Sequence, residues 1–307
     1  MNYPRVLLAA LALALVAGVL VAGVSSSAAF GAYNPAWDGT SELRSLAAEE
    51  GVETSFVRPG EPVGDPENGV AVVLAPDGSI DGERLRAFVA DGGTAVVAAD
   101  FGSDANPLLE SLNATARVDG RLLRDEQRHY RGPAMPRATN VTDASLVEGV
   151  NALTLNYGTG LAPNDARVLV RTSPYAYYDS NRNSELDDAE SVERYPVATV
   201  EPVGDGRVVA VGDPSLFINA MLERTGNRAF TSNLLAGADR LSLVVGEDAL
   251  PPLVAVLLTI RGSPLLQVLL GGGLLGLVGL WARSPGLLGR VRDRLGGAGP
   301  RTRNDSG

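Results

Sequence analysis

The chain has 307 residues, a formal net charge of −10 and no cysteine. The missing thiols exclude disulfides, thiolate metal sites, iron–sulfur clusters and cysteine nucleophiles. The negative charge argues against nucleic acid as a partner, because nucleic-acid binding needs basic patches that displace counterions.

The first predicted element is an apolar segment at 6–24, which follows a cytoplasmic stub at 1–5. The segment contains no charged residue, and about 20 apolar residues cross the hydrocarbon core of a bilayer. We interpret it as a transmembrane helix or an uncleaved signal anchor. A cleaved signal peptide is the alternative, because small residues follow the segment.

Strand and helix patterns then alternate. Valine-rich runs at 69–75 and 94–99 are typical of strands buried on both faces, and Asp81 can cap a helix between them. This pattern predicts a right-handed βαβ unit. The other predicted elements before the hairpin described below are helices at 41–50 and 106–112 and strands at 52–57 and 168–172.

The most specific chemical motif is the sequence DSNRNSELDDAE at Asp179–Glu190. Its residues match the oxygen-ligand positions 1, 3, 5, 7, 9 and 12 of a calcium loop. Ser184 stands where such loops have glycine, and the flanking segments resemble strands rather than helices. A metal-free acidic surface loop is the alternative. The predicted calcium ligands are Asp179, Asn181, Asn183, Glu185 (through its backbone carbonyl), Asp187 and Glu190.

A hairpin follows the motif, with strands at 196–202 and 207–212 around a glycine-rich turn. Asp213 and Pro214 are typical of a helix start. Two closing helices are predicted at 215–223 and 227–236. We therefore expect an exterior α/β domain at 25–250 with a mainly parallel sheet.

The C-terminal part resembles a second membrane anchor. A lead-in at 251–263 precedes an apolar run at 264–282, and the tail at 283–307 is rich in arginine. Cytoplasmic flanks carry such an excess of arginine. We expect a transmembrane helix at 264–282 and a basic cytoplasmic tail. This topology predicts a cell-membrane protein with most of its chain extracellular.

The basic residues are unusual, because every one is arginine except His129. An acidic, lysine-free composition is typical of proteins from salt-loving archaea, whose surface carboxylates hold water in brine. A high-GC genome that favours arginine codons is the alternative.

The segments GVAVVLAPDG (69–78) and DGGTAVVAADFGS (91–103) resemble the class I glutamine amidotransferase-like fold, a Rossmann-like layered architecture. With EPVGDGRVVAVGDPSLFIN (201–219) and GNRAFTSNLL (226–235), they resemble more closely the domain of unknown function 4350 family, in its archaeal membrane-anchored form. The resemblance implies an auxiliary component of a membrane system. The turn that would present a cysteine nucleophile in an amidotransferase carries Ser103 instead.

Three functions follow as hypotheses. The first is a non-catalytic, membrane-anchored exterior domain that binds a protein partner or a small-molecule ligand, with calcium ordering one loop. The second is a metal-assisted hydrolase that uses Asp100, Asp104 and Asp179. The third is a transport-system subunit. A Ser103 nucleophile with His129 as its base is a further arrangement, which the spacing does not support.

Overall fold

The computed structural model describes residues 3, 7, 10, 11, 13–15, 23, 25–58, 60–101, 105–244 and 250–283. The chain forms two compact units, Met1–Pro252 and Leu253–Gly307. The first unit contains all the strands described, and helices α7 (Pro252–Gly262) and α8 (Pro264–Arg283) follow them in the sequence.

The first unit mixes helices and strands between residues 41 and 111, and strands predominate between residues 117 and 211. Its helices are α2 (Ser41–Glu49), α3 (Gly82–Ala90), α4 (Ala105–Ser111), η1 (Ser145–Val147), η2 (Pro214–Phe217), α5 (Asn219–Leu222) and α6 (Thr225–Leu235). Its strands are β1 (Glu53–Val57), β2 (Gly69–Leu74), β3 (Thr94–Ala98), β4 (Arg117–Val118), β5 (Leu122–Asp125), β6 (Arg137–Ala138), β7 (Asn140–Val141), β8 (Leu153–Thr154), β9 (Leu161–Ala162), β10 (Arg167–Arg171), β11 (Ala176–Asp179), β12 (Pro196–Val203), β13 (Gly206–Val211) and β14 (Arg240–Val244).

The largest sheet has eight strands in the order β1-β14-β2-β3-β13-β12-β10-β7. The four pairings from β1 to β13 are parallel. The three pairings from β13 to β7 are antiparallel, as are the two-stranded sheets β5–β11, β4–β9 and β6–β8. The predicted βαβ unit is present, since β2 and β3 are parallel neighbours joined through α3.

The prediction of a mainly parallel, Rossmann-like or amidotransferase-like sheet is wrong. Six of the ten strand pairings among the described residues are antiparallel. The physical reason lies in the connections: parallel neighbours need a crossover of a dozen or more residues, whereas the two residues between β12 and β13 allow only an antiparallel hairpin.

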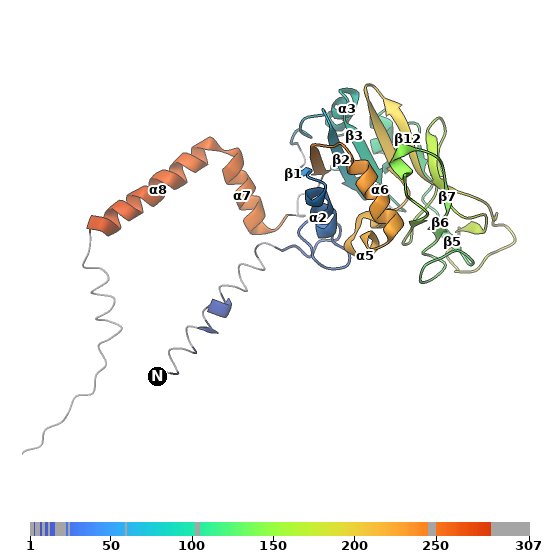
Figure 1. Cartoon of the computed structure of the whole chain (residues 1–307), viewed down its shortest axis with the longest axis horizontal. Coiled ribbons are helices and arrows are strands. Elements are labelled where there is room, and N and C mark those ends of the chain that lie inside the picture. The colour runs from blue at the N-terminus through green and yellow to red at the C-terminus, as the bar shows by residue number, and fades with distance from the viewer. Residues whose placement is uncertain are drawn as a thin grey trace, which may run out of the picture. The chain divides into compact units, whose positions relative to one another are not determined.

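Helices cover both faces of the parallel half of the sheet (Figure 1). Alternate residues of β2 enter two separate cores: Val70 and Val72 pack with α2 and α6, and Ala71 and Val73 pack with α3 and α4. This double burial explains why the strand is a continuous apolar run rather than an alternating one.

The predicted membrane anchors are corrected. Among the residues that the structure describes, no helix is long and apolar enough to cross a membrane. The run at 264–282 forms α8, whose leucines are separated by Gln267 and five glycines. The lead-in at 251–263 corresponds to α7. The predicted span at 6–24 and the tail at 283–307 lie largely outside the described residues.

Candidate metal centre

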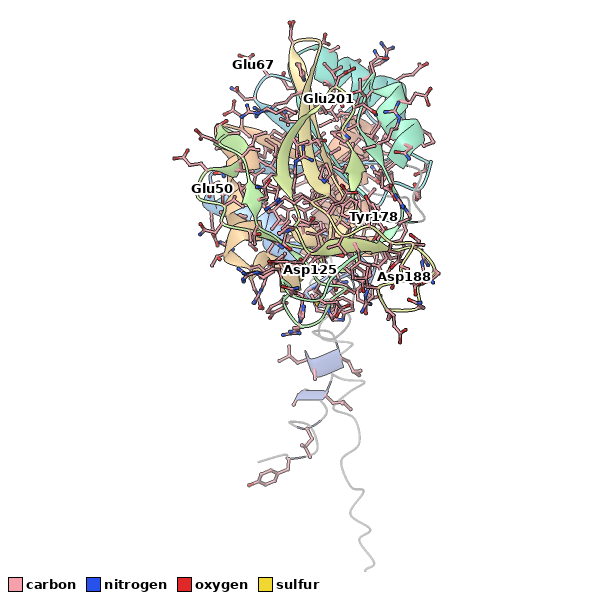
Figure 2. The ribbon with its side chains drawn as sticks, turned by 90° about the vertical axis from the view of Figure 1, so that its right-hand side faces the viewer. Glu50, Glu67, Asp125, Tyr178, Asp188 and Glu201 are labelled. Carbon is pink, nitrogen blue, oxygen red and sulfur yellow. The ribbon has the colours of Figure 1, made fainter. Side chains whose placement is uncertain are left out.

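The predicted calcium loop leaves the end of a buried strand. Strand β11 pairs with β5 and ends at Asp179, and the chain returns to a bridge between Ala176 and Glu193 before β12 begins. The flanking elements are thus strands, as the sequence predicted. This closed connection holds Asp179–Glu190 as one excursion from the sheet edge, with Asp188 at the surface (Figure 2).

Asp179 is the buried carboxylate of the loop, with its side chain 0% exposed. Its Oδ2 accepts the backbone N–H of Ser184 at 3.1 Å. Its Oδ1 is buried and has no hydrogen-bond partner among the described residues. A buried acceptor without a partner costs about 1–3 kcal/mol, and more when it is charged. Asp179 therefore presents an oxygen that a cation can satisfy.

One cationic side chain lies beside this carboxylate. Arg124 Nε is 3.8 Å from Asp179 Oδ2, too far for a hydrogen bond. The same Nε–H donates to Tyr177 Oη at 3.1 Å, and Nη1 donates to Ser184 Oγ at 3.2 Å. Arg124 thus places a positive charge beside Oδ2 and holds the turn through Ser184. Among the described residues, Oδ1 receives no hydrogen bond.

The turn adopts the left-handed backbone that calcium loops place at their sixth residue. Ser184 has φ +69°, and Arg182 has φ +58°. Left-handed backbone costs a non-glycine residue about 1–2 kcal/mol. The serine therefore takes the conformation expected of glycine, supported by its contacts to Asp179 and Arg124.

The remaining predicted ligands share one hydrogen-bond network. Asp187 Oδ2 accepts from the side-chain amides of Asn181 and Asn183 at 2.7 and 3.0 Å. Glu190 accepts the backbone N–H of Ser180 at 2.7 Å and of Asp187 at 3.2 Å. These contacts link four of the six predicted ligands, and Asp179 contacts the loop separately, through Ser184.

Glu185 is the sixth predicted ligand, and its side chain is exposed. It joins the network through its backbone N–H, which donates to Asn183 Oδ1 at 2.8 Å. Within the described part of the chain, no group of three or more His, Cys, Asp or Glu side chains is gathered for metal binding. Any ion here would therefore depend on amide and backbone oxygens as well as carboxylates.

The loop contacts the carboxyl end of β3, where a second acidic feature lies. The Arg182 guanidinium packs over the Phe101 ring at 4.7 Å from its centroid. Asp100 precedes this ring, and burial raises its pKa above the ordinary value. Ser103 and Asp104, which the sequence offered as catalytic candidates, lie outside the described residues.

Asp213, at the end of the adjacent strand β13, is the buried carboxylate that sequence reasoning did not identify as a site residue. Burial raises its pKa to about 7, and the charge of Asp100 adds to the rise. Both of its oxygens accept backbone N–H groups, from Asn156 at 2.6 Å and Ser215 at 2.7 Å. The Asp-Pro pair correctly predicted a helix cap. No signal in the sequence indicated that Asp100 lies near Asp213.

The predicted base His129 lies in a different region. Its Nδ1 is 2.8 Å from the backbone oxygen of Asp125, so the ring donates from Nδ1. Asp125 itself is buried and accepts the N–H groups of Gln127 and Arg128. These bonds build the turn that carries His129.

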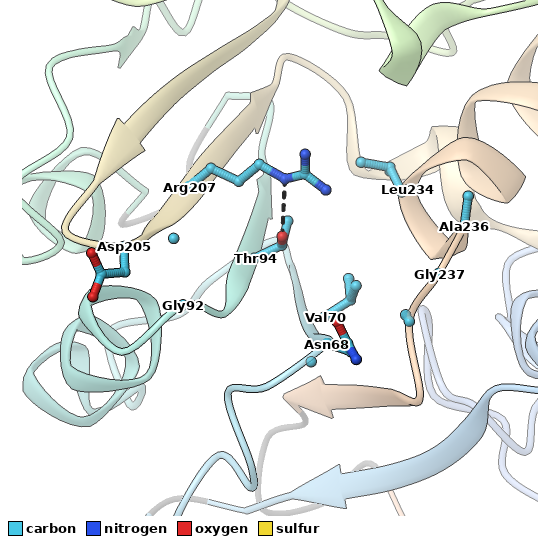
Figure 3. Close-up of a pocket in the computed structure, with 12 residues that line it drawn as sticks. Asn68, Val70, Gly92, Thr94, Asp205, Arg207, Leu234, Ala236 and Gly237 are labelled. Carbon is cyan, nitrogen blue, oxygen red and sulfur yellow. Dashed lines mark hydrogen bonds between the residues drawn. The ribbon is translucent and has the colours of Figure 1, made fainter.

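A cavity of about 310 Å³ opens at the amino ends of β2, β3 and β13 (Figure 3). Arg207 donates its Nε–H to Thr94 Oγ1 at 3.0 Å, and Asp205 points away from Arg207. The loop Asp179–Glu190 contacts Phe101, which follows the carboxyl end of β3. The cavity lies at the opposite ends of these strands and is therefore not part of the candidate metal centre.

Comparisons with known proteins give one family match and distant structural likenesses. A search of curated proteins finds no match to the sequence. The N-terminal domain described as mmIFT52 is 16% identical with a TM-score of 0.40, over 62% of this chain and 84% of that one. The exo-beta-1,4-mannosidase Op5Man5 from Opitutaceae bacterium strain TAV5 is 15% identical with a TM-score of 0.39, over 63% of this chain and 29% of that one.

A beta-galactosidase from Bacillus circulans sp. alkalophilus is 17% identical with a TM-score of 0.34, over 60% of this chain and 26% of that one. The chain thus spans less than a third of the length of either glycosidase. We draw nothing about function from likenesses this distant. The model of one family, described as "Domain of unknown function (DUF4350)", matches residues 32–235, which is most of the α/β unit. The chain therefore belongs to the DUF4350 family.

Proposed function

We propose that the chain is a non-catalytic binding domain whose loop Asp179–Glu190 binds a calcium ion. The observation that carries this proposal is Asp179 Oδ1, a buried carboxylate oxygen without a hydrogen-bond partner among the described residues. The amide and carboxylate oxygens of Asn181, Asn183, Asp187 and Glu190 lie in the same loop.

Calcium suits this loop better than a transition metal. Calcium takes six to eight oxygen ligands in flexible geometry, whereas zinc and copper favour sulfur or imidazole. The loop offers carboxylates, side-chain amides and backbone, and contains no His or Cys. Its five acidic residues and one arginine give a local charge of −4, which attracts a divalent cation. When bound, the ion would order the loop and supply no catalytic chemistry.

The hydrolase hypothesis has weaker support. It needs Asp100, Asp104 and Asp179 together, and Asp104 lies outside the described residues. The carboxyl group on which the charge of Asp100 acts is that of Asp213. A general acid or base needs an oxygen directed at substrate, but both oxygens of Asp213 accept backbone N–H groups. Asp213 therefore acts as a structural cap beside Asp100. The transport-subunit hypothesis needs membrane spans, and no helix among the described residues is long and apolar enough to cross a membrane.

The test is a calcium titration of the full chain and of two loop variants, followed by calorimetry and thermal unfolding. Wild type should bind calcium and gain stability, about 2.7 kcal/mol at a concentration of 100 times Kd. Asp179→Asn removes the charged buried ligand and should weaken binding at least tenfold. The matched control Asp188→Asn removes the same charge from an exposed, non-ligand position and should change binding no more than about twofold.

The unfolding data separate the metal from a simple ion pair with Arg124. If Asp179 serves calcium, Asp179→Asn should be as stable as wild type or more stable without calcium, and less stable in saturating calcium. Equal destabilisation in both conditions would instead identify Arg124 as its functional partner. Absence of binding heat and of a calcium-dependent rise in Tm in wild type would overturn the proposal.

A further inference from the structure

A second polar cavity, of about 370 Å³, lies away from the calcium loop. It is bounded by the turn after β5, by β6 and β8, and by the start of α6. Its volume falls within the range of small-molecule sites, which is about 300–1,000 Å³. The residues that line it are His129, Tyr130, Arg137, Asn151, Ala152, Thr154, Glu223, Arg224, Thr225 and Gly226.

The cavity gathers positive charge in a chain whose net charge is −10. Arg137 and Arg224 both line it, and His129 adds an imidazole. Glu223 is the single acidic residue of the lining; it accepts from Arg224 Nη2 at 3.1 Å, and its side chain is 71% exposed. Arg224 Nε is buried without a hydrogen-bond partner among the described residues. Arg224 therefore lines the cavity with a guanidinium that keeps one donor without an acceptor among the described residues.

The start of α6 adds backbone donors to the same cavity. Thr225 and Gly226 begin this 11-residue helix and line the cavity. No side chain in the described part of the chain caps this end, and its first turn contains no acidic residue. By contrast, Asp81 caps α3, and Asn219 Oδ1 accepts the N–H of Glu42 at the start of α2. Uncapped helix N-termini present N–H groups and positive dipole charge, which favour an anion.

Rigid contacts hold these groups in place. Asn227 accepts the N–H of Thr154 at 2.8 Å and donates to its carbonyl at 2.9 Å, which fastens α6 to β8. Gly226 packs so tightly on the backbone of Ala152 that a side chain there would collide with it. The Arg224 guanidinium stacks on the Tyr130 ring at 4.6 Å. The donors are therefore preorganised by packing.

We propose that this cavity binds a small molecule through a phosphate or carboxylate group, held by Arg137, Arg224 and the N-terminus of α6. Guanidinium groups bind both oxyanions through two parallel hydrogen bonds. This inference rests on the proposed binding function and names the chemical class of its ligand, but it does not depend on the calcium loop.

The test is calorimetric titration of the full chain with inorganic phosphate, and separately with acetate, in calcium-free buffer of low ionic strength. Binding of either anion with saturation, and retention of that binding in 150 mM sodium chloride, is the expected result. A preference for phosphate identifies a phosphate-bearing ligand, and a preference for acetate identifies a carboxylate-bearing one. Heat that does not saturate, or that chloride abolishes, would overturn the proposal.

Two variants and a control localise the site. Arg224→Gln and Arg137→Gln should each weaken binding about tenfold, the effect of one lost charge-assisted contact. Arg137 is exposed, so its variant keeps the test valid if Arg224→Gln does not fold. The control Arg128→Gln removes the same charge from a nearby side chain outside the lining and should bind as wild type. Equal weakening in all three would show nonspecific attraction and overturn the site.

Asp179→Asn keeps the two proposals distinguishable. This variant should bind phosphate or acetate as wild type does, because Asp179 does not line the cavity. If the chain binds calcium but neither anion, the anion-site proposal is overturned and the calcium proposal stands. If the chain binds an anion but not calcium, the calcium proposal is overturned and the anion-site proposal stands.

Discussion

Buried acidic side chains in this chain are held by backbone donors. Glu201, on β12, accepts the N–H and the hydroxyl of Thr115 and the N–H of Ala116, at 2.8–3.1 Å. Glu201 is buried, whereas Glu50 and Glu67 are exposed at the surface (Figure 2). Glu201 therefore fastens the segment after α4 to the sheet.

We expect Glu201→Ala to lower the free energy of unfolding by about 3 kcal/mol, because it leaves several buried donors without an acceptor. Urea denaturation followed by circular dichroism measures this loss. Glu50→Ala removes an exposed carboxylate and should change stability by no more than about 0.5 kcal/mol. A loss for Glu201→Ala as small as that of the control would show that water replaces the carboxylate.

At the scale of elements, local signals predicted the long pieces well. The hairpin occurs as β12 and β13, with Val203 paired to Gly206 and Gly204 at φ +61°. The helix predicted at 215–223 is instead divided into η2 and α5, because Ile218 adopts extended backbone between them. Asn219 begins the second piece and reaches across the fold.

Asn219 joins three segments through its amide. Its Oδ1 accepts the N–H of Glu42 at 2.8 Å, and its Nδ2 donates to the carbonyls of Asn34 and Ala36 at 3.0 and 2.6 Å. A single side chain thus caps α2 and fixes the segment that precedes it.

Asn219→Ala should therefore lower the free energy of unfolding by about 2–3 kcal/mol, the sum of a lost helix cap and two unsatisfied carbonyls. Amide hydrogen exchange should increase at the start of α2. Ser45→Ala, an exposed change within α2, is the comparison and should have little effect on either measurement. Unchanged exchange at Glu42 would contradict the capping role.

At the scale of the whole molecule, the parallel half of the sheet places two carboxylates next to each other. Asp100 follows β3 and Asp213 follows β13, and these strands are parallel neighbours. Their raised pKa values come mainly from burial. The fold therefore holds a proton on Asp213 in a pH range where the unfolded chain has already released it.

This linkage predicts stability that falls as pH rises. The pKa of Asp213 is about 7 in the folded chain and about 3.9 when unfolded, so the folded state binds more protons between pH 4 and 7. The free energy of unfolding of wild type minus that of Asp213→Asn should fall as pH rises across this range and become constant above it. Asp100→Asn should move the fall to lower pH, because it removes a charge that raises the pKa of Asp213. Urea denaturation at several pH values measures the free energy of unfolding of all three proteins. A difference between wild type and Asp213→Asn that increased with pH would refute the linkage.

Residues that are neighbours along the chain are enough to predict several elements and the chemistry of one loop. Apolar runs predicted the buried strands β2 and β3, the glycine-rich turn predicted the hairpin, and residue types predicted an oxygen-rich loop at Asp179–Glu190. Each of these signals lies within about a dozen residues, so a local pattern contains the information.

The folded chain shows which segments that are distant in sequence come into contact. It showed that the sheet is mixed, that the two-residue strand pair β4–β9 forms, and that Arg124 and Phe101 contact the loop Asp179–Glu190. It also showed that Asp179 Oδ1 has no hydrogen-bond partner among the described residues, and that Arg224 lines a cavity. The physical reason is that pairing, burial and hydrogen-bond satisfaction depend on contacts between residues far apart in sequence. Strands as short as two residues have no periodicity of their own, and packing alone makes them form.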